Sequence, residues 1–455
     1  MNKKTIGKIT FLAFVAAPLL LTSCASGKLK DAQKSYRLGA VGVAKSMING
    51  LAANEKAGAR DSELVFVEQG NILATAGDPA QAKLAYVQAD RSIEKHDQAA
   101  RIQLGNEAGA LLVNLNSLPY HTSPSEKLMA SSYLATVLLQ SGDLSAARSA
   151  IKLTKNRQLQ IYDAFQKQIE KEKATLKQAL NNDPSMKINL DSGRLDQETV
   201  RLQAAASQYQ CYNDLSVPYA EALAGVILGS GANAETARAN ESYTNALRAH
   251  PGSRYLRAAM GAAPNGTTHI FIEDGVAPEL GSFRFDIPIY INGAITTLSA
   301  SFPTFQPAPL GPLAGVKAGG STLAPDVICE FDRLASAEYK RKLPGTIART
   351  MASSTLKAVA GLAGQLAAQQ SGGQYGGLLA NGIGVASVIY NVASAQADAR
   401  IWSTLPKQVR YACVSTPSGG SVEVGGKSVK LPGNGSNLVI ARVINGQVFI
   451  RTAAL

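Results

Sequence analysis

The chain has 455 residues, enough for two or three domains that each enclose a hydrophobic core. Its formal net charge is +12, but residues 25–331 carry 29 basic and 29 acidic side chains, whereas residues 332–455 carry 13 basic and four acidic ones. The other three positive charges lie in residues 1–24, so beyond that start the excess is confined to the last third, which argues against a nucleic-acid-binding protein. It favours an anionic envelope surface as a partner, with a scattered basic surface that binds nothing as the alternative.

Residues 1–23 have the three parts of an export signal: a start with three lysines, an apolar run from Ile9 to Leu21, and small residues before a cleavage point. The run ends in Leu21-Thr22-Ser23-Cys24, which resembles the lipobox of bacterial lipoproteins. This resemblance implies cleavage before Cys24 and attachment of fatty acyl chains such as palmitate to that residue. No aspartate follows Cys24, which in the enterobacterial sorting pattern implies the outer membrane, facing the periplasm. An ordinary secretory signal with an incidental cysteine is the alternative.

Small and apolar side chains recur at tetratricopeptide-repeat (TPR) spacing in residues 62–94, 127–159 and 218–251. Turns between paired helices are expected at Gly77 and Gly142, with Ala82 and Ala147 at close helix contacts. The spacing predicts an all-helical, TPR-like repeat domain over residues 24–258, whose stacked pairs form a groove for a protein or peptide. A generic alanine-rich helical bundle is the alternative.

The character of the chain changes at the turn-rich residues 261–266. Short β-type runs follow over residues 269–272, 283–291, 295–302, 327–331, 408–414, 421–424, 438–443 and 447–451. Residues 358–397 carry no charged side chain and predict an alanine- and glycine-rich helical hairpin, buried within the domain rather than inserted in a membrane. The basic residues flanking it, Arg400 among them, are expected on the surface. The sequence thus predicts an α/β domain over residues 264–455, with strands around 283–301 and 408–451 in one antiparallel sheet, and an α+β fold for the whole chain.

Three blocks carry a likeness to a known family: YNDLSVPY at 212–219, EDGVAP at 273–278 and ADARIWSTLP at 397–406. They resemble blocks of an uncharacterised family of Gram-negative bacterial lipoproteins with TPR-like N-terminal helices. The resemblance spans most of the mature chain. It implies the architecture and the membrane anchor, but no site residues beyond the lipidated Cys24.

Chemical motifs are scarce. The four histidines, at positions 96, 121, 250 and 269, lie in no metal-binding motif, and no Cys-x-x-Cys is present, so the sequence predicts no metal site and no cofactor. Neither a nucleophile elbow nor a phosphate-binding loop occurs, so no catalytic residue is predicted. His269 beside Glu273 and Asp274 is a conceivable acid–base cluster, but satisfied structural residues are the favoured interpretation.

Trp402, the sole tryptophan, is expected to fill the junction between the uncharged hairpin and the sheet. With Cys24 lipidated, Cys211, Cys329 and Cys413 remain, an odd number that leaves at least one thiol unpaired. Cys329 and Cys413 both fall in strand-like segments, and the sequence leaves open whether they form a disulfide.

These features predict a non-enzymatic, membrane-anchored interaction or scaffold module. The alternative is a structural or membrane-active component of an envelope export or surface-polymer assembly, in which the uncharged hairpin contacts lipid or neighbouring copies. TPR-like folds serve many roles, so architecture alone does not choose between the two.

Overall fold

The computed structural model describes residues 27–102, 118–182, 193–212, 216–262, 265–291, 294–370 and 397–455. The predicted lipid attachment site, Cys24, lies outside these ranges, as does most of the uncharged hairpin, since residues 371–396 are not described. Mixed helix and sheet confirm the α+β fold class. None of the helices in the described ranges combines the length and the apolar character that crossing a membrane requires.

Three antiparallel helix pairs occupy the segments where the repeat pattern was found. They are α3 (Ser62–Thr75) with α4 (Pro79–Ile102), α6 (Pro124–Gln140) with α7 (Leu144–Asn182), and α10 (Pro218–Gly229) with α11 (Thr236–Ala249). The turns at Gly77 and Gly142 have φ near +80°, a conformation that favours glycine. A helix over residues 27–37 and α2 (Val41–Ala52) precede the pairs, while α9 (Gly193–Ser207) precedes the third pair and α12 (Arg254–Met260) follows it.

Glycines bring two of these pairs into close contact. A Cβ atom placed on Gly70 of α3 would lie 2.7 Å from the ring of Tyr86 on α4. The same arrangement recurs between Gly225 of α10 and Tyr243 of α11, where the distance is 2.6 Å. In both pairs a tyrosine ring from the second helix therefore packs against the backbone of the first helix.

The central sheet has five strands in the order β11-β10-β1-β7-β6. Its strands are β1 (Thr267–Asp274), β6 (Asp326–Glu330), β7 (Gln408–Ser415), β10 (Asn437–Ile444) and β11 (Gln447–Ala454). The β1 and β10 strands run parallel, whereas the other neighbours are antiparallel. A smaller sheet holds β5 (Ser321–Leu323), β4 (Val316–Ala318), β8 (Ser421–Val424) and β9 (Lys427–Lys430), in that order.

The prediction that residues 283–301 join the strands of 408–451 is wrong. They belong to a separate two-stranded ribbon of β2 (Glu279–Ile291) and β3 (Ala294–Gln306). Instead, β1 pairs with both β10 and β7, and β6 pairs with β7. The sheet, predicted as antiparallel, also contains one parallel pair, β1 with β10.

Both faces of the central sheet are buried, and alternate residues of β1 face opposite layers. Phe271 joins a core with α3, α6 and α10, together with Tyr411 and Ile440 of neighbouring strands. Ile270 and Ile272 join a second core with Val316 of β4 and Val424 of β8. The central sheet therefore lies between the helix pairs and the small sheet.

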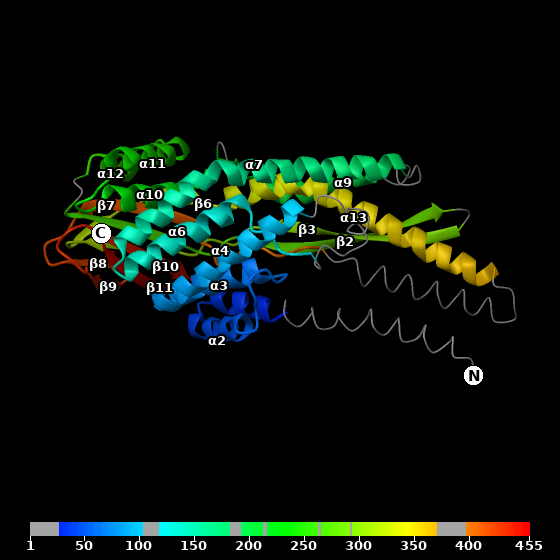
Figure 1. The fold of residues 1–455 in the computed structure, drawn as a ribbon. Helices are drawn as coiled ribbons and strands as arrows, with labels where there is room; N and C mark the ends of the chain where they lie inside the picture. Colours follow the sequence, from blue (N-terminus) through cyan, green and yellow to red (C-terminus); the bar gives the residue numbers. More distant parts are fainter. Residues whose placement is uncertain are drawn as a thin grey trace.

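An elongated arm extends from this body. Figure 1 shows α7, α9 and α13 (Phe331–Gln370) running beside the β2–β3 ribbon, away from the end that holds β8 and β9. A separate apolar cluster, which includes Leu202 of α9, Phe302 of β3 and Leu343 of α13, holds the arm together.

Candidate binding cavity and its glutamate–histidine cluster

The inner face of the helix pairs is filled by the chain itself. All residues of α3 except Gln69 are buried, and α6 and α10 are buried along most of their length. Residues 397–406 run along this face: Asn71 of α3 donates to the Thr404 carbonyl at 2.7 Å, and the Trp402 amide donates to Glu126 of α6 at 2.9 Å. The surface expected to form an open groove is thus covered by residues that follow α13 in the chain.

Trp402 is fully buried, as its predicted core role requires. Its ring packs near Tyr86 of α4 and Tyr133 of α6, with centroids 6.5 Å and 6.0 Å apart. It therefore fills space between the helix pairs and the central sheet, while most of the uncharged hairpin, beside which the sequence places it, lies outside the described residues.

A cavity of about 450 Å³ lies beside residues 397–406, among α4, the N-terminus of α6, α7 and α13. Phe165 and Ile169 of α7 and Leu343 of α13 supply apolar wall. The polar lining carries both signs of charge, from groups that include Lys342, Glu338 and Arg400. Concave sites of this size with mixed lining are typical of ligand or peptide binding.

Two buried glutamates shape the α6 side of the cavity. Glu126 accepts hydrogen bonds from the Tyr120 hydroxyl at 2.8 Å and from the Ser123 amide at 2.7 Å, and it completes a capping box with Ser123. Glu338 of α13 accepts from the amide and the hydroxyl of Ser125, at 2.8 Å and 3.0 Å. Burial raises the pKa of Glu338, despite these donors and the nearby Lys342. Glu338 thus ties α13 to the start of α6.

Arg400 lies mostly out of solvent, with its side chain 11% exposed, contrary to the sequence-based expectation of a surface position. Its guanidinium pairs with Asp61 and with Asp398, each at 2.7 Å, and donates to the Leu118 carbonyl at 3.0 Å. Burial alone would lower the pKa of Arg400, but the two carboxylates outweigh it and leave the pKa raised. Arg442 and Arg451 are buried, so part of the C-terminal positive charge is internal.

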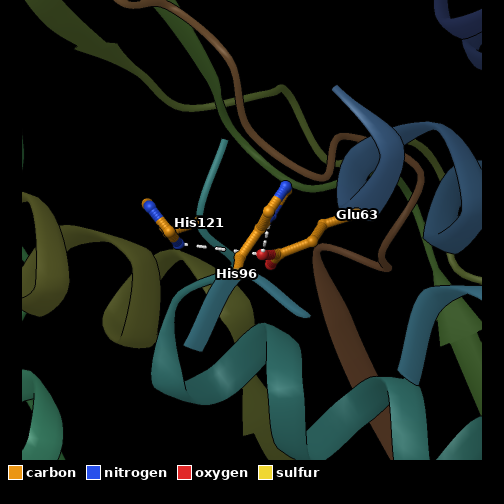
Figure 2. A group of neighbouring side chains, drawn as sticks. All are labelled: Glu63, His96 and His121. Atoms are coloured by element: carbon orange, nitrogen blue, oxygen red, sulfur yellow. Dashed lines mark hydrogen bonds and ion pairs between the residues drawn. The ribbon is translucent and has the colours of Figure 1, made fainter. Parts of the chain in front are cut away.

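Glu63, His96 and His121 meet at one end of the cavity, although they come from α3, α4 and the segment before α6 (Figure 2). Nδ1 of His96 lies 2.7 Å from Oε1 of Glu63, and Nδ1 of His121 lies 3.7 Å from the same oxygen. Oε2 accepts from the amide and the hydroxyl of Thr122, at 2.7 Å and 2.6 Å. Both histidines line the cavity; His96 is buried and the His121 side chain is 37% exposed.

The electrostatics of this cluster favour an ionised glutamate. Burial would raise the pKa of Glu63, but the hydrogen bonds from His96 and Thr122 outweigh burial and lower it. The hydrogen bond to Glu63 raises the pKa of His96, whereas burial lowers that of His121. A neutral His121 presents a lone pair, as a metal ligand must.

The conceivable acid–base cluster at His269 is not assembled. His269 and Glu273 share one face of β1, while Asp274 faces the opposite layer and pairs with Arg410 at 2.6 Å. His269 is buried against Tyr411, with Nδ1 2.7 Å from the hydroxyl, and burial lowers its pKa to about 3. Glu273 is buried among structural partners: it accepts from Tyr133, Tyr219 and Arg451.

All three cysteines of the described ranges are free, and no disulfide joins Cys329 to Cys413. Burial raises the pKa of Cys413 to about 11 and that of Cys329 to about 12, so both stay protonated thiols at neutral pH.

Sequence reasoning missed the Glu63–His96–His121 cluster because its members lie 33 and 25 residues apart, in no motif. For Glu126 a signal was present: Ser123-Pro124-Ser125-Glu126 has the form of a capping box. No family model matches the chain, and comparison with curated proteins and with solved structures finds no significant match.

Proposed function

We propose that the chain is a lipid-anchored envelope protein, held by Cys24 at the outer membrane facing the periplasm, that acts as a non-enzymatic interaction scaffold. The lipobox supports the anchor. The repeated glycine–tyrosine contact of α3–α4 and α10–α11 supports a TPR-like origin of the helix pairs.

A segment of a partner protein binds in the cavity beside α13, rather than on the inner face of the helix pairs. The observation that carries this proposal is that residues 397–406 already cover that inner face, while the cavity beside them remains lined by mixed side chains. Apolar wall beside charged groups of both signs suits a peptide, whose backbone and side chains present the same mixture.

The anchor is tested by replacing its attachment atom. The Cys24→Ala variant is expected to leave the membrane fraction, or to accumulate as an unprocessed precursor, because the acyl chains then have no thiol to join. A variant that is still processed and membrane-bound like the parent contradicts the anchor.

The partner site is tested by photo-crosslinking in the native envelope. Thr346, which lines the cavity, receives a photoreactive side chain, and Leu84, 56% exposed on α4, receives the same group as a matched control. A discrete protein adduct is expected from position 346 and not from position 84. Equal adducts from both positions contradict a specific site.

The second candidate is the membrane-active component, favoured by the arm of α7, α9, α13 and the β2–β3 ribbon that extends from the body (Figure 1). The same crosslinking experiment separates the two. Adducts with phospholipid instead of protein at position 346 support the membrane-active function.

A further inference from the structure

Three side chains that serve as metal ligands in proteins converge at one end of the cavity. The ligating atoms of Glu63, His96 and His121 all lie within 4.8 Å of one another. In Figure 2 the two imidazole rings approach the Glu63 carboxylate from different sides, and both dashed lines end on one carboxylate oxygen.

The spacing suits a small cation. Tetrahedral coordination with bonds of about 2.0 to 2.1 Å places neighbouring ligand atoms about 3.3 Å apart. The distances from Oε1 of Glu63, 2.7 Å to Nδ1 of His96 and 3.7 Å to Nδ1 of His121, lie on either side of that value. All three ligand atoms lie within 4.8 Å of one another, so side-chain rotation can bring them to coordinating positions.

A second observation points to a ligand independently. His96 is 5% exposed, and its other ring nitrogen, Nε2, is buried with no hydrogen-bond partner. If Nδ1 carries the proton toward Glu63, the Nε2 lone pair is left unmatched. If Nε2 carries it, the Nδ1 lone pair faces a carboxylate oxygen, and if both nitrogens carry protons, the buried Nε2–H has no acceptor. A cation between Nδ1 and Glu63 removes the repulsion between that lone pair and the carboxylate.

Surrounding groups fix the orientation of the carboxylate. Thr122 donates twice to Oε2 of Glu63, at 2.7 Å and 2.6 Å, which leaves Oε1 directed at the two histidines. Hydrogen bonds of this kind orient the ligands of metal sites.

We propose that Glu63, His96 and His121 bind one divalent transition-metal ion, of the class of Zn²⁺, with an open coordination position reached from the cavity. Two imidazole nitrogens and one carboxylate favour Zn²⁺ or Co²⁺ over Mg²⁺ and Ca²⁺, which prefer oxygen ligands alone. Three protein ligands leave a fourth position for water or for a ligand in the cavity, which His96 and His121 line. This metal site does not depend on the proposed peptide partner, because one chain supplies all three ligands.

The test uses the full chain in detergent, without a histidine tag and after removal of metal with a chelator. Zn²⁺ affinity is measured by competition with a chromophoric chelator, and Co²⁺ serves as a spectroscopic probe whose visible absorption reports tetrahedral coordination. One ion per chain is expected. The His121→Gln variant, altered at the most exposed of the three side chains, is expected to bind at least about 100-fold more weakly, since even outer-shell losses cost about 10- to 100-fold.

His250→Gln is the matched control, because His250 is bonded to Tyr212 and belongs to a different region. It is expected to bind Zn²⁺ like the parent chain. His96→Gln gives a second variant at a buried ligand, with circular dichroism to verify its fold. No stoichiometric binding, unchanged affinity in His121→Gln, or equal losses in His121→Gln and His250→Gln would each overturn the proposal.

Discussion

Glu68 of α3 is fully buried, and four donors surround its carboxyl group. It accepts hydrogen bonds from Gln33 at 2.7 Å and from the Ser403 amide at 2.8 Å, and also from the hydroxyl groups of Ser403 and Thr404. Burial raises the pKa of Glu68 to about 7 although these donors favour the ionised form. The desolvation of one carboxyl group thus outweighs its own hydrogen bonds.

This pKa makes stability depend on pH. Between the ordinary value of 4.5 and about pH 7, the folded chain holds a proton on Glu68 that the unfolded chain has released, so stability falls as pH rises through this window. From pH 5 to pH 8, the parent is expected to lose up to about 3 kcal/mol more unfolding free energy than Glu68→Gln. Urea unfolding of both proteins at each pH measures this, and the histidine contributions cancel in the comparison. Parallel pH profiles would contradict the raised pKa.

At the scale of elements, the helix pairs, whose members are neighbours in the chain, could be predicted from the sequence. The pairing of strands that are far apart in the chain could not. The helix pairs follow from turn glycines and small residues close together in the chain, and Ala82 and Ala147 are indeed fully buried. Which strands pair is not a local property: β1 lies against β10, about 170 residues later, while β2 and β3 leave the sheet as a ribbon. The glutamate–histidine cluster was invisible for the same reason, since only tertiary packing joins its members.

The glycine–tyrosine contacts give a test of helix pairing. Gly70→Ala and Gly225→Ala each place a methyl group within 3 Å of a tyrosine ring and are expected to lower the unfolding free energy by about 1 to 3 kcal/mol. Gly50→Ala in α2 is the matched control: nothing lies within 4 Å of its added Cβ, so it is expected to stabilise by about 0.5 to 1 kcal/mol. Chemical denaturation measures all three. Equal effects at Gly70 and Gly50 would mean that the close approach does not constrain the pair.

At the scale of the molecule, one core spans both ends of the chain. Leu29 and Ile48 of the N-terminal helices belong to the same apolar cluster as Leu438 and Ala453 of the last two strands. Buried hydrogen bonds join the layers as well: Tyr133 of α6 donates to Glu273 of β1 at 2.9 Å, and Arg442 of β10 donates to the Tyr36 hydroxyl at 3.0 Å. The helix pairs and the sheet therefore stabilise each other.

We expect thermal unfolding to be a single transition. Trp402, the only tryptophan, lies at the junction of helices and sheet, so its fluorescence reports that junction while far-ultraviolet circular dichroism reports mainly the helices. Coincident transitions are expected from the two probes. A chain shortened to end before Asn437 loses β10 and β11 and is expected to show no cooperative transition. Separate midpoints in the intact chain would mean that the two parts unfold independently.

The hydrogen bond between Arg442 and Tyr36 joins residues 406 positions apart, so it forms only after nearly the whole chain has been synthesised. Synthesis produces the helix pairs first, whereas the strands β10 and β11, which complete the core they share with the helices, come last. Until those strands are made, the apolar core that Leu438 and Ala453 share with Leu29 and Ile48 stays incomplete. For the exported protein proposed above, which would cross the inner membrane unfolded, a core completed by the last two strands delays folding until nearly the whole chain exists.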